Sequence, residues 1–296
     1  MKITIVQFSP SGSISKVTAM ISRELEARGQ SVQLVNIAGD ELFFVEKNIS
    51  EFLHRNIKEH DVLLVGGPVY AHHLQYHVQD LLKALPRPGG KWGRYAVPYV
   101  CYGGISSGIA LKEAAGLLKR SGRTVFAGMK VSSPHSMTRA FMDAEFNKDK
   151  LQSDSLPEVT ELADRIISLN PETGTKCNAR QMHYNGAITA LKAKIIFREK
   201  LWHEKRYPQI SISGERCTAC GKCVRKCPVL HLRKENKRIF ENHDSPCVHC
   251  FNCVTQCPSG AINLVGDMEK GKAFMSGMIA RQGGRELPAT AVYPLR

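Results

Sequence analysis

The sequence lacks an apolar run long enough to cross a membrane. A spanning helix needs about 18 or more consecutive apolar residues, and no run in the 296 residues reaches that length. Met1 leads directly into an apolar segment, without the charged and apolar regions of a signal peptide. We therefore expect a cytoplasmic protein with no transmembrane segment.

Two recognition patterns are also missing. No G-x-G-x-x-G motif opens the first helical stretch, which argues against direct use of NAD(P)H. The formal charge of +14 would suit nucleic acid, but the basic residues form no block and no aromatic platform accompanies them, so we expect no nucleic-acid partner. Because the excess charge is spread over all regions of the chain, it suits an acidic redox protein or an anionic substrate better.

Cysteine, in contrast, is abundant, and eight of the ten cysteines form two copies of one pattern. The pattern is Cys-x-x-Cys-x-x-Cys-x-x-x-Cys-Pro, and the second copy follows the first by thirty residues. The two copies consist of Cys217, Cys220, Cys223 and Cys227, and of Cys247, Cys250, Cys253 and Cys257. Such regular repetition indicates an internal structural repeat.

This spacing suits iron–sulfur clusters, because three thiolates two residues apart wrap one corner of a cubane. In two-cluster proteins the fourth cysteine of each run binds the other cluster. The sequence therefore predicts two [4Fe-4S] clusters with crossed ligands. One is expected on Cys217, Cys220, Cys223 and Cys257, and the other on Cys247, Cys250, Cys253 and Cys227.

Zinc and disulfides are the alternatives to clusters. A structural zinc takes four ligands, which leaves the third evenly spaced cysteine and the Cys-Pro pairs unexplained. Cysteines in a reducing compartment are metal ligands more often than disulfides. Residues 207–266 also resemble the bacterial-type two-cluster ferredoxins, and the resemblance covers both motifs and both prolines, Pro228 and Pro258.

The first part of the chain alternates between apolar strands and amphipathic helices. Strands are expected at 2–8, 32–36, 62–66, 95–102 and 124–131, and helices after residue 15 and near 49–59, 75–84, 108–120 and 156–168. This alternation predicts a parallel sheet covered by helices on both faces. Ligands in such sheets bind beyond the carboxyl ends of the strands.

A loop rich in serine and glycine, Ser9–Ser15, separates the first strand from the first helix. Hydroxyl groups and the N–H groups of a helix's first turn can hold a phosphate without a cationic side chain. Serine also caps helices in ordinary turns, so the loop by itself leaves both interpretations open. The other loops at the ligand edge are expected at 67–73, 102–108 and 132–136.

Residues 1–170 resemble a flavodoxin in the Ser9–Ser15 loop and in the Gly-Pro-Val-Tyr and Tyr-Gly-Gly loops that follow the third and fourth strands. The resemblance implies an α/β fold with a doubly wound, parallel, five-stranded sheet in the order 2-1-3-4-5, and FMN as cofactor. It implies phosphate binding by Ser9, Ser11, Gly12, Ser13, Ile14 and Ser15, and isoalloxazine contacts from Pro68, Val69, Tyr70, Ala71, Tyr102, Gly103 and Gly104. Ile14 departs from the family pattern, in which threonine is usual.

Three histidines in these loops, His72, His73 and His135, are candidates to donate a proton to a substrate or to the flavin. The alternative is that they are loop histidines with no role in the reaction. Residues 171–206 are expected to form a linker and a basic amphipathic helix, which either lies on a membrane or packs on the flavodoxin-like domain. Residues 267–296 are a C-terminal tail, either disordered or folded over a neighbouring domain.

The whole chain resembles the flavodoxin–ferredoxin fusion proteins of anaerobic prokaryotes, and this resemblance implies electron transfer. Clusters carry single electrons, whereas a flavin holds one or two. The preferred interpretation is a reductase that passes electrons from the clusters to FMN and on to an acceptor or small-molecule substrate. The alternative is a carrier that connects a donor protein to a partner enzyme. A cavity lined by the histidines or the tail would favour the reductase, and an open flavin edge the carrier.

Overall fold

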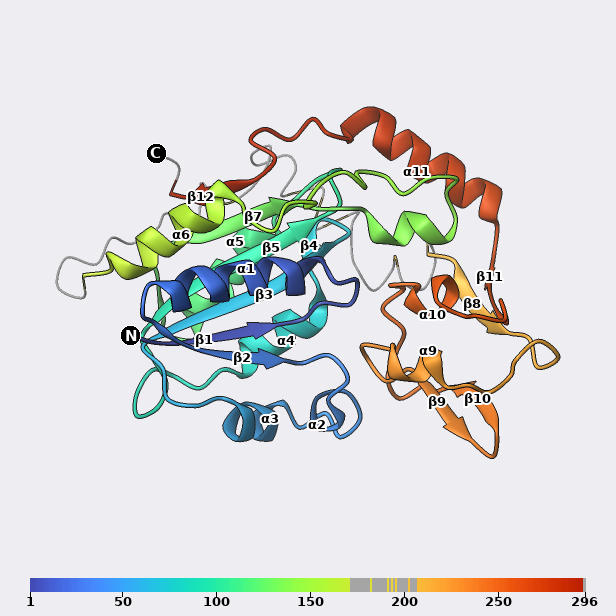
Figure 1. Cartoon of the computed structure of the whole chain (residues 1–296), viewed down its shortest axis with the longest axis horizontal. Coiled ribbons are helices and arrows are strands. Elements are labelled where there is room, and N and C mark those ends of the chain that lie inside the picture. The colour runs from blue at the N-terminus through green and yellow to red at the C-terminus, as the bar shows by residue number, and fades with distance from the viewer. Residues whose placement is uncertain are drawn as a thin grey trace.

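The computed structural model describes residues 1–170, 182, 191, 193, 195, 202 and 207–294. The linker and helix predicted over 171–206 therefore lie almost entirely outside the described residues. Figure 1 shows a twisted sheet with helices on both faces and a smaller unit beyond one end of its strands. The helix α11 (Met268–Gln282) runs from that unit back toward the sheet.

The sheet has the strand order that the resemblance to a flavodoxin implies. Its parallel strands, in spatial order, are β2 (Ser31–Asn36), β1 (Lys2–Gln7), β3 (Val62–Tyr70), β5 (Tyr95–Tyr102) and β7 (Gly128–Ser132). In chain order this is 2-1-3-4-5, the flavodoxin-like arrangement, which confirms the α/β fold.

The expected fifth strand, 124–131, is divided into β6 (Thr124–Val125) and β7. Ala96 pairs with Val125 and Tyr99 with Met129, so β5 advances by three residues while its partner advances by four. One extra residue on one strand is the pattern of a β-bulge, which bends the strand and ends regular pairing.

The sheet also extends beyond the five predicted strands. A short strand from the C-terminus, β12 (Ala291–Tyr293), pairs antiparallel with β7. Near the ligand edge, β4 (His73–Leu74) folds back on the end of β3. Segments of two and three residues are too short to show a strand periodicity, which is why the sequence did not predict them.

Two helical layers cover the sheet. Buried side chains join α1 (Ser13–Ala27) and α6 (Pro157–Ile167) to one face. The other face is covered by α2 (Glu41–Phe44), α3 (Ile49–Asn56), α4 (Tyr76–Ala84) and α5 (Ala110–Arg120). The buried residues of α1 recur every three or four positions, as an amphipathic helix requires.

Gly66 in β3 leaves room for the Tyr99 side chain to lie over it on the α1 face of the sheet. A Cβ atom at this position would lie 2.1 Å from the ring of Tyr99 on the neighbouring strand. Tyr99 is fully buried, and its hydroxyl forms a 2.5 Å hydrogen bond with the hydroxyl of Thr18 in α1. The absence of a side chain at residue 66 thus fixes how α1 sits on the sheet.

The smaller unit contains the two cysteine motifs. Its elements are β8 (Gln209–Ile212), α9 (Lys222–Arg225), β9 (Leu232–Glu235), β10 (Arg238–Glu241), α10 (Asn252–Thr255) and β11 (Ile262–Val265). β8 pairs with β11 and β9 with β10, both antiparallel. The two short helices start thirty residues apart, so the sequence repeat is also a structural repeat.

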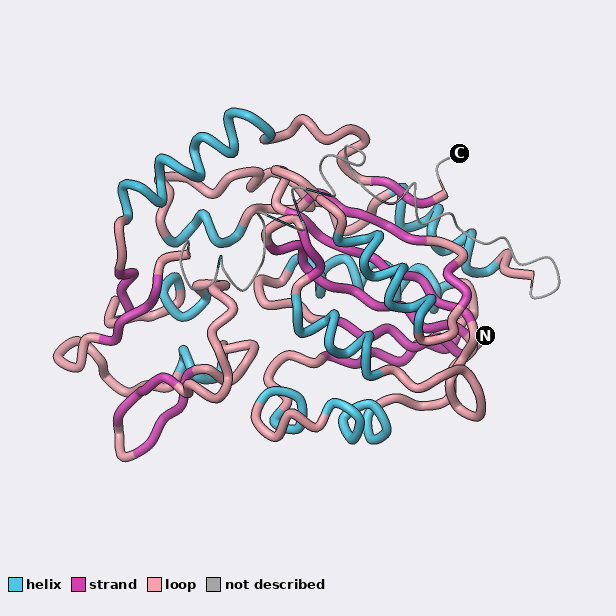
Figure 2. Tube along the Cα trace, turned by 180° about the vertical axis from the view of Figure 1, so that it is seen from behind, coloured by secondary structure: helices cyan, strands magenta, loops and turns pink. Residues whose placement is uncertain are grey.

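The C-terminal tail is folded over the neighbouring domain, which decides between the two alternatives that the sequence left open. Asp267 caps α11 by accepting a hydrogen bond from the Lys270 N–H at 2.9 Å. Beyond the helix, the Glu286 carboxylate is 1% exposed and lies 2.5 Å from the Lys130 ammonium of β7. Figure 2 shows the same course from behind. No described helix is both long and apolar enough to cross a bilayer.

A short 3-10 helix, η1 (Ser136–Ala140), follows β7 and packs against the cysteine-containing unit. Phe141 directly follows this helix. Its ring centroid lies 6.3 Å from that of Phe251, in a T-shaped contact. A common apolar cluster joins this segment to Met275 and Met278 of α11. The loop after β7, the cysteine unit and α11 therefore form one packed region beside the carboxyl ends of the strands.

Candidate functional site

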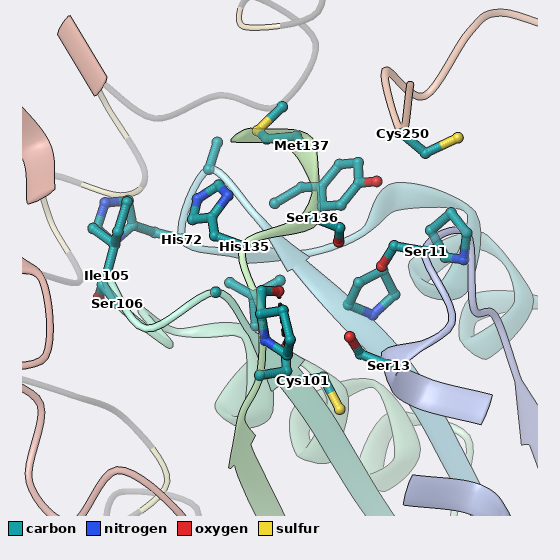
Figure 3. A pocket seen from close by; sticks show the side chains of 18 of the residues that line it. Ser11, Ser13, His72, Cys101, Ile105, Ser106, His135, Ser136, Met137 and Cys250 are labelled. Atoms are coloured by element: carbon teal, nitrogen blue, oxygen red, sulfur yellow. Dashed lines mark hydrogen bonds between the residues drawn. The ribbon is translucent and has the colours of Figure 1, made fainter. Parts of the chain in front are cut away.

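A cavity lies at the carboxyl ends of the parallel strands, where the fold predicts a ligand site. Its lining comes from the loop after β1, the segments at the ends of β3, β5 and β7, residues 202 and 207, the second cysteine motif, and α11. The predicted site residues among its lining are Ser9, Ser11, Ser13, Ile14, Pro68, Val69, Tyr70, Ala71, His72, Gly103, His135 and Cys250. Figure 3 shows Ser11 and Ser13 on one side and His72 and His135 on the other.

The Ser9–Ser15 loop takes the geometry of a helix start. Gly12 is the residue before α1, and its φ of 96° lies in the left-handed region that glycine tolerates best. The Ser15 N–H donates to the Ser9 hydroxyl at 2.9 Å. Ser9 thus caps the helix, while the hydroxyls of Ser11 and Ser13 line the cavity. The Ser9 contact fits the helix-cap interpretation, and phosphate binding by the other serines stays a prediction.

The loop after the third strand is a strained hairpin. Ala71 and His72 have φ values of 45° and 68°, and they connect β3 to β4, where Tyr70 pairs with His73. Two successive positive φ values mark a type I′ turn, which normally uses asparagine and glycine. A non-glycine residue in this region costs about 1 kcal/mol or more. The hairpin presents Ala71 and His72 to the cavity.

The three candidate histidines are placed differently. His72 and His135 line the cavity, and burial lowers the pKa of each to about 4. His73 is not among the described lining residues. Its Nδ1 lies 2.7 Å from the Glu113 carboxylate and its Nε2 lies 2.9 Å from the Ala193 carbonyl oxygen. This placement gives His73 a structural role in joining α5 to the hairpin.

The loop after β5 brings its backbone against His135. A Cβ atom at Gly103 would lie 2.5 Å from the His135 ring, so only glycine fits. Tyr102, Gly104, Gly12 and Ser15 are not among the described lining residues. The Tyr102 hydroxyl instead donates to the Ala289 carbonyl oxygen at 2.8 Å, in the segment that leads to β12. A flavin contact from Tyr102 stays a prediction.

Four of the motif cysteines surround a small hollow in the first half of the repeat. They are Cys217, Cys220, Cys223 and Cys257, the set that the sequence predicts for one cluster. Cys220 is exposed, and the backbone N–H of Lys222 lowers its thiol pKa. The Ala261 N–H donates to the Cys257 sulfur at 3.3 Å. Backbone N–H donors of this kind stabilise thiolates bound to a cluster.

The other predicted ligand set consists of Cys227 and the first three cysteines of the second motif. Cys227 is an electrostatic neighbour of Cys247, Cys250 and Cys253, although it belongs to the first motif. Burial raises the pKa of the Cys250 and Cys253 thiols to about 12. Because a cluster is bound by thiolates, its loading would release the protons of these thiols.

The two halves share unusual backbone geometry. Ala219 and His249, thirty residues apart, have φ values of 51° and 53°. Leu230 and Gly260 form a second such pair, at 56° and 57°. In each half, the N–H of the next residue points to the last cysteine of the motif, with His231 donating to the Cys227 sulfur at 3.2 Å. The left-handed residues therefore turn N–H groups toward the cluster positions.

The second cysteine motif lies directly against the Ser9–Ser15 loop. The Asn252 side-chain amide donates to the Pro10 carbonyl oxygen at 2.5 Å. Cys250, two residues earlier, is itself a lining residue of the cavity, and Figure 3 shows it above Ser11. The second cluster position and the ligand cavity are thus neighbours, which no local sequence pattern could establish.

The sequence missed the side of the cavity that comes from outside the predicted loops. These lining residues include Met137, Trp202, Tyr207, Phe274, Met275 and Met278. For α11 a signal was available: Asp267 is a common type of helix cap, and residues 274, 275, 278 and 279 are apolar at helical spacing. The described lining contains no lysine, arginine, aspartate or glutamate.

Comparison with known families identifies the cysteine-containing unit. Residues 209–273 match the 4Fe-4S dicluster domain family. An uncharacterized ferredoxin of Methanocaldococcus jannaschii is 30% identical over 57 residues, which is 18% of this chain and 74% of that protein. Subunit I of the NAD(P)H-quinone oxidoreductase of Gloeobacter violaceus is 30% identical over 82 residues, 24% of this chain and 39% of the relative.

Other relatives share only a small part of their length. The chain covers 9% and 10% of a protein named as a formate dehydrogenase in Staphylococcus aureus and of one named as an oxidoreductase in Bacillus subtilis. Among solved structures, an NADH:FMN oxidoreductase in its apo form is 18% identical, with a TM-score of 0.42 over 59% of this chain and 94% of the other. The assignment of the α/β domain rests on its own strand order.

Proposed function

Because the chain belongs to the proteins with a 4Fe-4S dicluster ferredoxin domain and joins that domain to a flavodoxin-like one, we propose that it is a reductase. In this proposal the motif cysteines would hold two [4Fe-4S] clusters for single-electron transfer, and the cavity would hold an FMN beside a bound small-molecule acceptor. The FMN supplies the exchange between one-electron and two-electron chemistry. Joining both domains in one chain makes the transfer intramolecular.

The observation that carries the proposal is the position of Cys250. Cys250, a predicted cluster ligand, lines the same cavity as Ser11 and Ser13 of the Ser9–Ser15 loop. The hydrogen bond from Asn252 to the Pro10 carbonyl oxygen fixes the two segments against each other. Electron transfer requires short separations, and here the second cluster position and the expected FMN site adjoin.

The residues of the cavity fit an FMN phosphate. The cavity-facing hydroxyls of Ser11 and Ser13 stand at the start of α1, a fifteen-residue helix. The N-terminus of a helix of this length attracts an anion through its dipole and its N–H groups. We propose that these serines and the Gly12 backbone hold the phosphate, with Ser9 occupied as a helix cap.

The position of α11 along the cavity favours a reductase over a carrier. Phe274, Met275 and Met278 of α11 line the cavity together with His72 and His135. A carrier that reacts with a partner protein needs an exposed flavin edge, whereas a reductase gains from a covered site that excludes water. The C-terminal helix therefore supports a bound small-molecule substrate.

The lining also indicates the chemistry of that substrate. Among the described lining residues no charged side chain offers an anionic substrate a counter-charge. We propose an uncharged, largely apolar acceptor, in place of the anionic one that the net charge suggested. Its apolar part would contact Met137, Met275 and Met278, whose flexible side chains adapt to different shapes.

The two cavity histidines are neutral in this proposal. With pKa values of about 4, His72 and His135 carry no proton charge at neutral pH. Each can therefore orient an acceptor through a ring N–H, but neither is an imidazolium acid. A two-electron reduction consumes two electrons, from two reductions by a one-electron donor, and two protons, which water supplies.

The proposal is tested by loading and reactivity together. Protein purified without oxygen should contain about eight irons and one FMN per chain. The double variant Ser11→Ala/Ser13→Ala should bind FMN at least about tenfold more weakly, because hydrogen bonds to a charged group contribute about 1.5 to 3 kcal/mol each. Iron content should not change. The matched control is Ser153→Ala/Ser155→Ala, in an exposed loop.

The acceptor class is tested with a matched pair of quinones. Chemically reduced protein should be reoxidised faster by the uncharged quinone menadione than by the anionic anthraquinone-2-sulfonate, and FMN-depleted protein should react slowly with both. Two zinc ions in place of iron would refute the cluster assignment. Equal menadione rates with and without FMN would refute the reductase.

A further inference from the structure

The two cysteine motifs differ strongly in charge. Residues 214–238 contain eight lysine and arginine residues and two glutamates. The corresponding residues of the second repeat, 244–268, contain two aspartates and no lysine or arginine. Summing the charge over the whole domain conceals this difference, which is why the excess charge was expected to be spread evenly.

The difference is concentrated on the two equivalent short helices. Lys222, Arg225 and Lys226 lie on or just after α9, where the second repeat has asparagine, threonine and glutamine in and after α10. All three cationic residues are exposed. Three pairs of equivalent positions thus differ in charge, and the cations belong to the helix that is exposed to solvent.

The cations surround an exposed cluster cysteine. The Arg225 guanidinium donates to the Cys220 carbonyl oxygen at 3.2 Å. The side chain of Lys234, from the β9–β10 hairpin, passes 3.7 Å from the Cβ position of Gly221, the residue after Cys220. We call Lys222, Arg225, Lys226 and Lys234 the basic collar. No described carboxylate lies within 4.0 Å of any of these four side-chain nitrogen groups.

The second repeat faces the opposite way, into the molecule. Phe251 and His249, on either side of Cys250, are 2% and 4% exposed. Asn252, the counterpart of Lys222, is the residue that contacts Pro10. The flavodoxin-like domain therefore occupies the side of the second cluster position, and only the first has a cysteine open to a partner.

We propose that the basic collar around Cys220 is the docking surface for an acidic one-electron donor protein. This inference rests on the proposed function, because it assigns the place where electrons enter. Each encounter transfers one electron. The donor loses that electron and the protein gains it. Two encounters supply the two electrons that reduce one acceptor.

Charge and size both favour a small acidic protein. Complementary charge speeds encounter between redox partners and orients them, and it allows rapid release because the interface is small. Nucleic acid would need a longer basic surface with aromatic platforms for the bases. The collar is instead a compact group of cations around a single exposed cysteine.

The test reverses the collar charge in the full-length, cluster-loaded protein. The variant is Lys222→Glu/Arg225→Glu/Lys226→Glu, and the control is Arg55→Glu/Lys58→Glu/Arg87→Glu, three exposed residues of the flavodoxin-like domain with the same change in net charge. The probe is a reduced, acidic bacterial two-cluster ferredoxin. Stopped-flow absorbance follows reduction of the clusters at low salt.

The collar variant should be reduced at least about tenfold more slowly, and added salt should slow the wild type toward the rate of the variant. The control should stay within about twofold. Dithionite should reduce all three proteins to the same final extent, which shows intact clusters. The proposal is overturned if the collar variant keeps the wild-type rate or if the control loses as much.

Two further outcomes separate this inference from competing ones. Salt-sensitive binding of a random single-stranded RNA that the collar variant loses, with an unchanged rate of reduction by ferredoxin, would assign the surface to nucleic acid and overturn the proposal. Repeating the measurement on FMN-depleted protein separates donor docking from the reductase. Docking requires only the clusters, so the difference between collar and control must persist there.

Discussion

The two ends of the proposed electron path are built on the same backbone and placed in opposite surroundings. The first repeat keeps Cys220 exposed among permanent cations. The second places the half-buried Cys250 beside a cavity whose described lining is uncharged. Ligation of a cluster fixes the spacing and the left-handed turns in both halves, whereas docking against another domain decides which residues fill the space around them.

Releasing α11, which lines the cavity beside the second motif, should give the largest loss of stability. The Glu286 carboxylate anchors the segment after α11 by contacting the Lys130 ammonium and accepting from the Ser107 N–H at 2.7 Å. Glu286→Ala removes one partner of a buried ion pair, a change that typically costs about 3 to 5 kcal/mol. The midpoint of thermal unfolding should fall, and FMN should dissociate more readily as α11 loosens.

The matched variant Glu286→Gln keeps the shape and a carbonyl acceptor for Ser107 but removes the charge. Its loss of stability should be smaller than that of Glu286→Ala, because one hydrogen bond remains. The fluorescence of released FMN measures how readily the cofactor dissociates when α11 is loosened. An unchanged FMN affinity in Glu286→Ala would show that α11 is not held in place by this ion pair.

The pH dependence of stability should report on the cavity, because the pKa of its lining residue His72 is shifted. Burial, followed by the neighbouring His73, lowers the pKa of His72 from 6.5 to about 4. The unfolded chain therefore binds this proton more readily than the folded one. The stability contribution is complete above about pH 6.5 and falls by about 3 kcal/mol as the pH drops through 4.

His72→Asn tests this effect with little risk to the fold, because asparagine tolerates the φ of 68° at this position. Thermal midpoints measured from pH 7 to pH 4 should fall less steeply for the variant than for the wild type. The rate of reduction by ferredoxin should stay flat between pH 6 and pH 8, since lysine and arginine keep their charge. Parallel stability curves would contradict the low pKa of His72.

The sequence predicted the parts of the molecule that depend on local chemistry. Cluster ligation requires a fixed cysteine spacing, so the cysteine sets could be derived, and apolar periodicity located the strands that define the sheet order. The sequence could not predict that Asn252 contacts Pro10, 242 residues away, because no local pattern encodes that approach. The same limit applies to β12 and to Glu286, whose partners Lys130 and Ser107 are distant in the chain.

The smallest of the three effects concerns the equivalent residues Gly221 and Phe251, which have φ values of 72° and 56°. The exposed end uses glycine at no strain, whereas the buried end accepts a strained phenylalanine that packs on Phe141. Phe251→Gly loses about 3 to 4 kcal/mol of burial and regains about 1 to 2 from the relieved backbone, a net loss of about 2 kcal/mol. Gly221→Ala should cost about 1 kcal/mol.

These changes are compared by the temperature at which cluster absorbance is lost without oxygen. Both variants should retain about eight irons per chain at low temperature, because neither residue is a ligand. Phe251→Gly should also slow the reoxidation of the clusters by menadione, since the ring holds the second motif against the loop after β7, whereas Gly221→Ala should not. If the two substitutions slowed reoxidation equally, the tight packing of the second repeat would have no role in transfer toward the cavity, and the contrast between the two ends would be one of exposure alone.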